Sequence, residues 1–248
     1  MPAIQQLDLA TFDGVLLDGL DFCRKVYDLF DQVRNGPDGI ARLRLRPEKL
    51  DKKLLEELIP IARYVQERYR AGRRIKVRWF SGSQPYDAVF WSSGSVIAHR
   101  MEPRRLFVEV TTSSHQNEYL VREAVHKQGG AFGPKSITRE RKTRAIVSKP
   151  HATTLDERST DLADQILTAL RKKATKNYPP GMALIINCIP DGFIYETDWQ
   201  AAIHQVEKAQ LHLCFREVFL FEMVMGYSKT LCGNGKRPAQ DQTSPHRS

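Results

Sequence analysis

The sequence predicts an α/β (α+β) fold in which helices flank a central mixed β-sheet. Short apolar runs bounded by turn residues alternate with longer segments of helical periodicity. The run MALIINCI (182–189) is almost wholly apolar, which is typical of a central strand covered on both faces. The run RRIKVRWF (73–80) alternates charged and apolar residues, as a half-buried strand does.

Length and composition narrow the class of protein. A chain of 248 residues can bury one good core, or one domain with an appendage. No apolar run reaches membrane-spanning length, so we expect no membrane partner and a cytoplasmic location. The four cysteines form no CxxC pair, which argues against a structural zinc site or a disulfide framework. The net charge of +9 favours an anionic partner, and nucleic acid is the usual one.

Residues 1–46 are expected to form an N-terminal extension outside the main domain. An amphipathic helix is predicted within 16–33, followed by a dense turn at 35–39. The run ARLRLR (41–46) alternates and predicts a short edge strand with its arginines outward. The main α/β domain should span 47–232. Residues 233–248 are Gly, Pro, Ser and charge, and this composition predicts a disordered tail.

Within the main domain the pattern changes from helix to strand and back. A long helix opens after Pro47, and Pro60 should kink or divide it because proline lacks a backbone N–H. A capping box of Thr154 and Glu157 marks the start of a later helix. In chain order we predict a helix at 48–71, strands at 73–80, 86–91 and 106–112, helices at 114–127 and 154–177, a strand at 182–189, a helix at 197–209 and a strand at 215–225.

Two of the predicted strands each carry one carboxylate, Asp87 in YDAVFW and Glu109 in RLFVEV. A carboxylate in a buried strand is costly unless it is paired or binds a cation. If the two strands are antiparallel neighbours, both carboxylates can converge at one end of the sheet. Two structural alternatives stay open: Asp87 could satisfy backbone donors at a strand start, and Glu109 could form a buried ion pair with Arg78 or Arg105.

The order helix, three strands, helix, strand over about 48–225 resembles the core of the PD-(D/E)XK nuclease-like superfamily, the restriction-endonuclease-like fold. Asp87 matches the first acid of its motif. The run Glu109-Val110-Thr111 matches the second acid and its spacing, but Thr111 stands where the motif has a lysine.

This resemblance implies a metal-dependent phosphodiesterase in which Asp87 and Glu109 ligate Mg²⁺ or Mn²⁺. Thr111 cannot supply the positive charge of the motif lysine, so Lys127 on the following helix is the candidate for that role. Glu57 on the first helix is the candidate for an additional acid. The resemblance also implies a role in bacterial defence or in a mobile element.

A basic segment follows the predicted site. We expect it to hold the phosphate backbone of DNA or RNA, although it could also be a solvated loop. A catalytically inactive module for nucleic-acid binding or protein assembly remains the alternative function, and a homodimer or a larger complex is compatible with it. The candidate nucleic-acid-binding residues are Lys135, Arg139, Arg141, Lys142 and Arg144.

Overall fold

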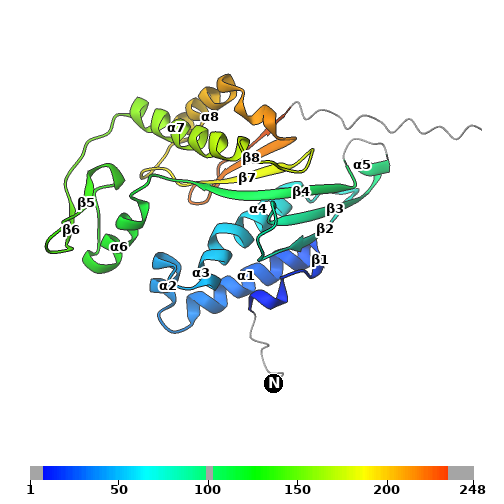
Figure 1. Cartoon of the computed structure of the whole chain (residues 1–248), viewed down its shortest axis with the longest axis horizontal. Helices are drawn as coiled ribbons and strands as arrows, with labels where there is room; N and C mark the ends of the chain where they lie inside the picture. The colour runs from blue at the N-terminus through cyan, green and yellow to red at the C-terminus, as the bar shows by residue number, and fades with distance from the viewer. Residues whose placement is uncertain (1–7, 99–102, 234–248) are drawn as a thin grey trace, which may run out of the picture.

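The computed structural model describes residues 8–98 and 103–233 and confirms the α/β class (Figure 1). A seven-stranded mixed sheet has the order β1-β2-β3-β4-β7-β8-β9. Strands β4, β7 and β8 are parallel, and every other neighbouring pair in this sheet is antiparallel. The strands are β1 (Leu16–Asp18), β2 (Arg73–Trp79), β3 (Ala88–Gly94), β4 (Arg105–Ser113), β7 (Ala183–Cys188), β8 (Glu217–Glu222) and β9 (Ser228–Cys232).

Helices cover both faces of this sheet (Figure 1). On one face lie α1 (Gly19–Asn35), α2 (Gly39–Leu45), α3 (Lys49–Lys53) and α4 (Ile59–Arg68), and on the other lie α7 (Leu155–Ala174) and α8 (Glu196–Ala209). A short α5 (Ser95–Ala98) follows β3. The helix α6 (Glu118–Gln128) packs with a separate hairpin of β5 (Ile137–Arg139) and β6 (Ile146–Ser148) around a small core of their own.

Side chains alternate across the sheet, which produces two cores. In β7, Ala183 and Ile185 belong to the core under α1 and α4, whereas Leu184 and Ile186 belong to the core under α7 and α8. This alternation explains why the run is apolar at every position. In β4, the same rule sends Val108 and Val110 toward α4, so the intervening residue, Glu109, faces α7.

The described part of the expected extension, from residue 8 to residue 46, shares the main core. Phe12 and Phe22 are fully buried in the same cluster as α4 and the sheet. The strand β1 pairs with β2, which adds the first strand of the described chain to the main sheet. At Gly19 a Cβ atom would lie 2.9 Å from the backbone oxygen of Ile75, so α1 approaches β2 as closely as only glycine allows.

The edge strand predicted at 41–46 is wrong, because this segment is the helix α2. The alternation of apolar and charged residues suggested a strand. The arginines instead lie four residues apart, the spacing at which a helical turn brings each one to an acidic partner. Arg42 pairs with Asp51, which is completely buried, at 2.8 Å. Arg46, one turn later, pairs with Glu56 at 3.0 Å. Only the tertiary structure brings these acids to α2.

Pro60 divides the long predicted helix through a π-helical turn at Leu54–Leu58, between α3 and α4. The N–H of Ile59 donates to the oxygen of Leu54, five residues back, where an α-helix would use four. Proline cannot donate the next hydrogen bond, so the widened turn ends where the donor is missing. Glu57 lies in this turn.

No helix in the part of the chain that the structure covers has the length and hydropathy needed to cross a bilayer. The tail predicted to be disordered at 233–248 lies outside the described residues, except for Gly233.

We predict that Phe22→Ala lowers the free energy of unfolding by about 3–5 kcal/mol, because it leaves a cavity in the main core. Urea denaturation of the full chain measures this loss. Leu20→Ala is the matched control, since Leu20 lies on the same helix and is 52% exposed. A loss below about 1 kcal/mol for Phe22→Ala would mean that the N-terminal segment contributes little to the main core.

Candidate active site

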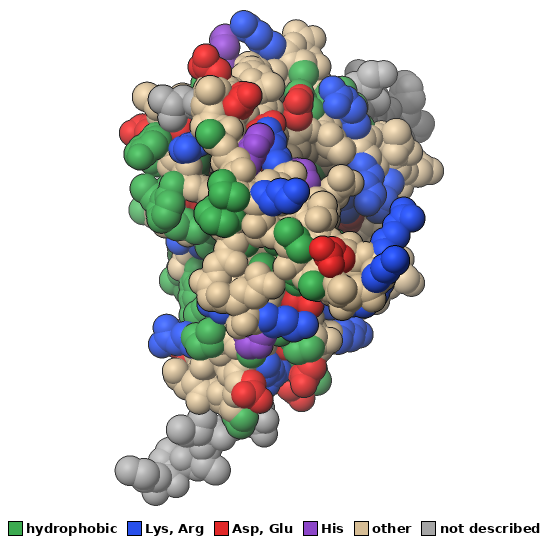
Figure 2. Space-filling model, turned by 90° about the vertical axis from the view of Figure 1, so that its left-hand side faces the viewer, with side chains coloured by type: hydrophobic (Ala, Val, Ile, Leu, Met, Phe, Trp, Pro, Cys, Tyr) green, Lys and Arg blue, Asp and Glu red, His purple; other side chains and the backbone are tan. Residues whose placement is uncertain are grey.

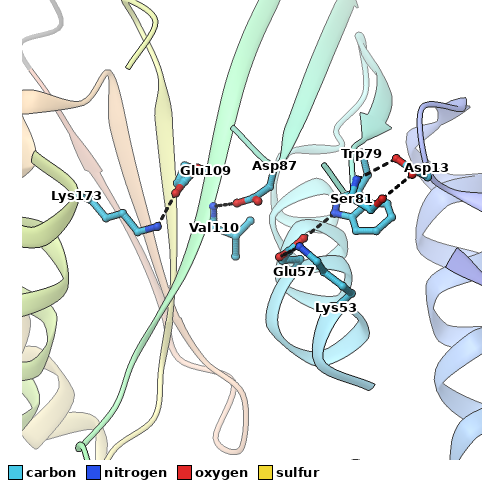
Figure 3. Close-up of polar contacts among 9 residues, drawn as sticks. All are labelled: Asp13, Lys53, Glu57, Trp79, Ser81, Asp87, Glu109, Val110 and Lys173. Carbon is cyan, nitrogen blue, oxygen red and sulfur yellow. Dashed lines mark hydrogen bonds and ion pairs between the residues drawn. The ribbon is translucent and has the colours of Figure 1, made fainter. Parts of the chain in front are cut away.

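Asp87 lies where β3 and β4 separate. The ladder between them ends at the pair Ala88 and Val108, so the N–H of Val110 has no strand partner on that side. The Asp87 carboxylate accepts this N–H at 2.7 Å, as Figure 3 shows. The backbone N–H of Asp87 donates to the oxygen of Val108 at 2.9 Å and fixes the residue at the opening. Asp87 therefore does satisfy a backbone donor, as the structural alternative proposed, but from the neighbouring strand.

Glu109 points from β4 toward α7 and is 7% exposed. Its Oε1 atom lies 2.5 Å from the Nζ of Lys173 (Figure 3). The same oxygen accepts a hydrogen bond from the Tyr178 hydroxyl at 3.2 Å. Lys176 lies further out, at 3.8 Å. Burial, followed by the charge of Glu109, raises the pKa of Tyr178, so this hydroxyl stays protonated and remains a donor.

The partners considered for Glu109 from sequence, Arg78 and Arg105, are used elsewhere. Their guanidinium groups lie 5.4 and 5.8 Å from the ring centroid of Trp91. Both arginines therefore pack against an aromatic ring, and Glu109 forms its ion pair with a lysine instead.

Glu57 reaches the same region from the π-helical turn (Figure 3). Each of its two carboxylate oxygens contacts a different partner. Oε1 lies 2.5 Å from the Nζ of Lys53, and Oε2 accepts the indole N–H of Trp79 at 3.0 Å. Glu57 is thus oriented by one charged and one neutral donor.

The three carboxylates interact electrostatically. Burial raises the pKa of Asp87 to about 7, and repulsion by Glu57 and then by Glu109 adds to the effect. The hydrogen bond from Val110 and the charge of Lys173 act in the opposite direction. Asp87 is therefore a buried carboxylate whose charged form is disfavoured first by burial and then by its acidic neighbours, and a bound cation would favour that charged form.

This donor set suits a hard divalent ion that keeps part of its water shell. In the described residues, no three His, Cys, Asp or Glu side chains are placed to hold a metal ion by themselves. Mg²⁺ typically binds through one or two carboxylates together with waters and substrate phosphate. Asp87 and Glu109 meet that smaller requirement, and Glu57 lies within electrostatic reach of Asp87.

The structure places a different lysine than expected beside Glu109. Lys127 instead pairs with Glu123 on its own helix at 2.8 Å, and its side chain is 62% exposed. Arg139, followed by Lys127, lowers the pKa of Glu123 to about 2, so this group forms a separate ion-pair network. Thr111 lies on the same face of β4 as Glu109 and lines a cleft beyond it.

Lys173, in the basic cluster that ends α7, is not among the site residues predicted from the sequence. A signal was present in the sequence. Ile166 and Leu170 mark the buried face of this helix, and Lys173 follows Leu170 by three residues, so it lies on the same face. A lysine on an apolar stripe needs a buried partner, and Glu109 is that partner.

The five basic residues predicted to bind nucleic acid fall into two groups. Lys135 and Arg139 form ion pairs with Asp161 and Glu123, so they stabilise the fold. Arg141, Lys142 and Arg144 are exposed in the turn between β5 and β6. Figure 2 views the molecule from the end where α6 and this hairpin lie, and Lys and Arg side chains are spread over much of that face. The hairpin turn is therefore the part of the segment available to an anionic ligand.

We predict that Asp87→Asn stabilises the fold at pH 8 and has little effect near pH 4. The raised pKa means that the folded state binds this proton more tightly than the unfolded chain does. Wild-type stability should therefore fall as pH rises from about 4 to about 7, by on the order of 1.4 kcal/mol per pH unit. Asparagine keeps an acceptor for Val110 and removes the charge.

Urea denaturation of both proteins across this pH range measures the difference in unfolding free energy. A difference that stays constant with pH would show that Asp87 is an ordinary, unperturbed carboxylate.

Comparison of the chain with protein-family models, with curated proteins and with solved structures gives no match.

Proposed function

We propose that this protein is a nuclease-like, metal-dependent phosphodiesterase acting on nucleic acid. The observation that carries the proposal is the ammonium of Lys173 at 2.5 Å from Glu109, beside a second buried carboxylate, Asp87, whose pKa is raised. Two acids and a lysine are the groups that the PD-(D/E)XK motif would supply. Here the lysine comes from α7, and Thr111 occupies its position in the strand.

The order of elements supports the same proposal. The π-interrupted helix, the strands β2, β3 and β4, the helices α6 and α7, and the strand β7 follow one another as in the resemblance. Asp87 precedes β3 and Glu109 lies within β4, on neighbouring antiparallel strands. At the opening between these strands Asp87 accepts the N–H of Val110, and the negative charge of Glu109 acts on Asp87.

Each side chain then has a role that its surroundings support. Asp87 and Glu109 would hold Mg²⁺ or Mn²⁺, which when bound neutralises phosphate charge and favours attack by water. Lys173 holds Glu109 in place and offers a positive charge toward the developing charge on a phosphate. Glu57 keeps negative charge beside Asp87, and Tyr178 orients Glu109 by donating to it.

The inactive module remains a second candidate, and one observation favours it. Lys173 and Tyr178 both contact the Oε1 atom of Glu109, so this carboxylate already has partners without any metal ion. Cleavage assays separate the two candidates.

We predict Mg²⁺- or Mn²⁺-dependent cleavage in a mixed set of DNA and RNA substrates. Glu109→Gln should lower the rate by about 10²-fold or more, because it removes the charge that holds the cation. Lys173→Met should cause a similar loss, whereas Lys127→Met should retain wild-type activity. Cleavage unaffected by Glu109→Gln would contradict the proposal.

Folding of these variants needs a control, since loss of Lys173 leaves Glu109 buried and unpaired at a cost of about 3–5 kcal/mol. Lys173→Arg keeps the charge and should remain folded, with activity between that of wild type and that of Lys173→Met. Circular dichroism and urea denaturation verify the fold of each variant before its rate is compared.

We also predict that Arg141→Ser combined with Lys142→Ser weakens nucleic-acid binding and lowers its salt dependence. Each lost phosphate contact should reduce the slope of log affinity against log salt by about 0.7–0.9. Fluorescence anisotropy at several salt concentrations measures the slope. Arg24→Ser with Arg34→Ser on α1 is the control of equal charge, and an equal effect of both pairs would mean that net charge alone acts.

A further inference from the structure

A polar cleft of about 510 Å³ continues from the candidate active site along β4. Its lining includes Thr111 and Ser113 at the end of β4, and Gln165, Thr168 and Lys172 on α7. Thr111 follows Glu109 by two residues on the same strand face, and Lys172 precedes Lys173. The cleft therefore adjoins the position at which the phosphate would be held.

Apart from the Oδ2 of Asp161, which is ion-paired with Lys135, three side chains of this cleft carry a buried atom without a hydrogen-bond partner in the protein. They are the Oγ of Ser113, the Oε1 of Gln165 and the Oδ2 of Asp191. Ser113 is 1% exposed, and the amide of Gln165 donates to the other oxygen of Asp191 at 3.1 Å. Buried polar atoms without partners are rare in folded proteins. All three atoms can accept a hydrogen bond, so they suit a ligand that brings donors.

The charges in the cleft argue against a second phosphate site. Asp161, Asp164 and Asp191 line it, and of its two lysines Lys135 is paired with Asp161. A neutral group that donates a hydrogen bond, beside a phosphate, has the chemistry of a sugar hydroxyl.

We propose that this cleft accepts the ribose next to the phosphate held at Asp87 and Glu109, and that it selects RNA through the 2′-hydroxyl. This inference rests on the proposed function. The 2′-hydroxyl is the group by which a protein distinguishes RNA from DNA at one position. Its single hydrogen can be donated to one of the three acceptors, Ser113, Gln165 or Asp191, once that side chain turns its buried oxygen toward the cleft, and DNA brings no such donor.

Binding of oligo(U) and oligo(dU) to the full chain tests the inference, with Ca²⁺ in place of Mg²⁺ so that the cation site can be filled while cleavage is suppressed. Uracil carries no exocyclic amine, so a preference for oligo(U) comes from the sugar. We expect oligo(U) to bind about tenfold more tightly, the ratio that one hydrogen bond to a buried acceptor supports. An oligo(U) with 2′-O-methyl groups should bind like oligo(dU), because its donor is blocked.

Gln165→Leu and Ser113→Ala should bring the RNA-to-DNA ratio close to one and leave oligo(dU) affinity unchanged. Thr168→Val is the control on the same helix and should keep the ratio. Equal binding of both sugars by wild type would overturn the inference, as would a ratio that survives both variants. A preference for amine-bearing bases on either sugar would also overturn it, since the cleft would then recognise bases.

The readout is independent of catalysis. RNA selectivity with no metal-dependent cleavage would contradict the proposed activity and leave the ribose cleft supported. Metal-dependent cleavage of both RNA and DNA, with no preference in binding, would support the proposed activity and contradict the ribose cleft.

Discussion

The ion pair between Glu109 and Lys173 determines how the two halves of the molecule meet. Glu109 lies in the middle of β4, a strand with apolar neighbours, where an unpaired carboxylate would be costly. Lys173 lies near the end of α7, and its side chain is only 12% exposed. Removing either charge would leave the other buried and alone. The pair therefore joins the end of α7 to β4, while buried residues such as Ile166 and Leu170 pack this helix against the sheet.

A second constraint acts on the opposite face, where Pro60 and the π-helical turn set the direction of Glu57. Widened turns of this kind occur often at functional sites, because they redirect a side chain without ending the helix. Here the turn allows Lys53 and Trp79 to hold the two oxygens of Glu57. The result is a carboxylate held by Lys53 and Trp79 whose negative charge acts on Asp87.

These arrangements keep negative charge concentrated at the end of β3. A structure selected for stability alone would not place Asp87 beside Glu57 and Glu109, because their repulsion opposes folding at neutral pH. Perturbed carboxylates cluster at functional sites, although structural ion-pair networks also perturb them. The network of Glu123, Lys127 and Arg139 illustrates the structural case, since its charges are balanced and its carboxylate pKa is lowered.

The sequence by itself determined the fold class, the order of the main strands and helices, and the two carboxylates of the candidate site. Apolar alternation marked β2, and the fully apolar run marked β7, because both patterns reflect burial that repeats along the chain. Only the tertiary structure decided that Arg42 lies in a helix capped by Arg46, that residues 8–46 share the main core, and that Lys173 stands beside Glu109. Each of these depends on a partner distant in the chain, Asp51, Glu56, the sheet or Glu109, and local periodicity carries no information about such partners.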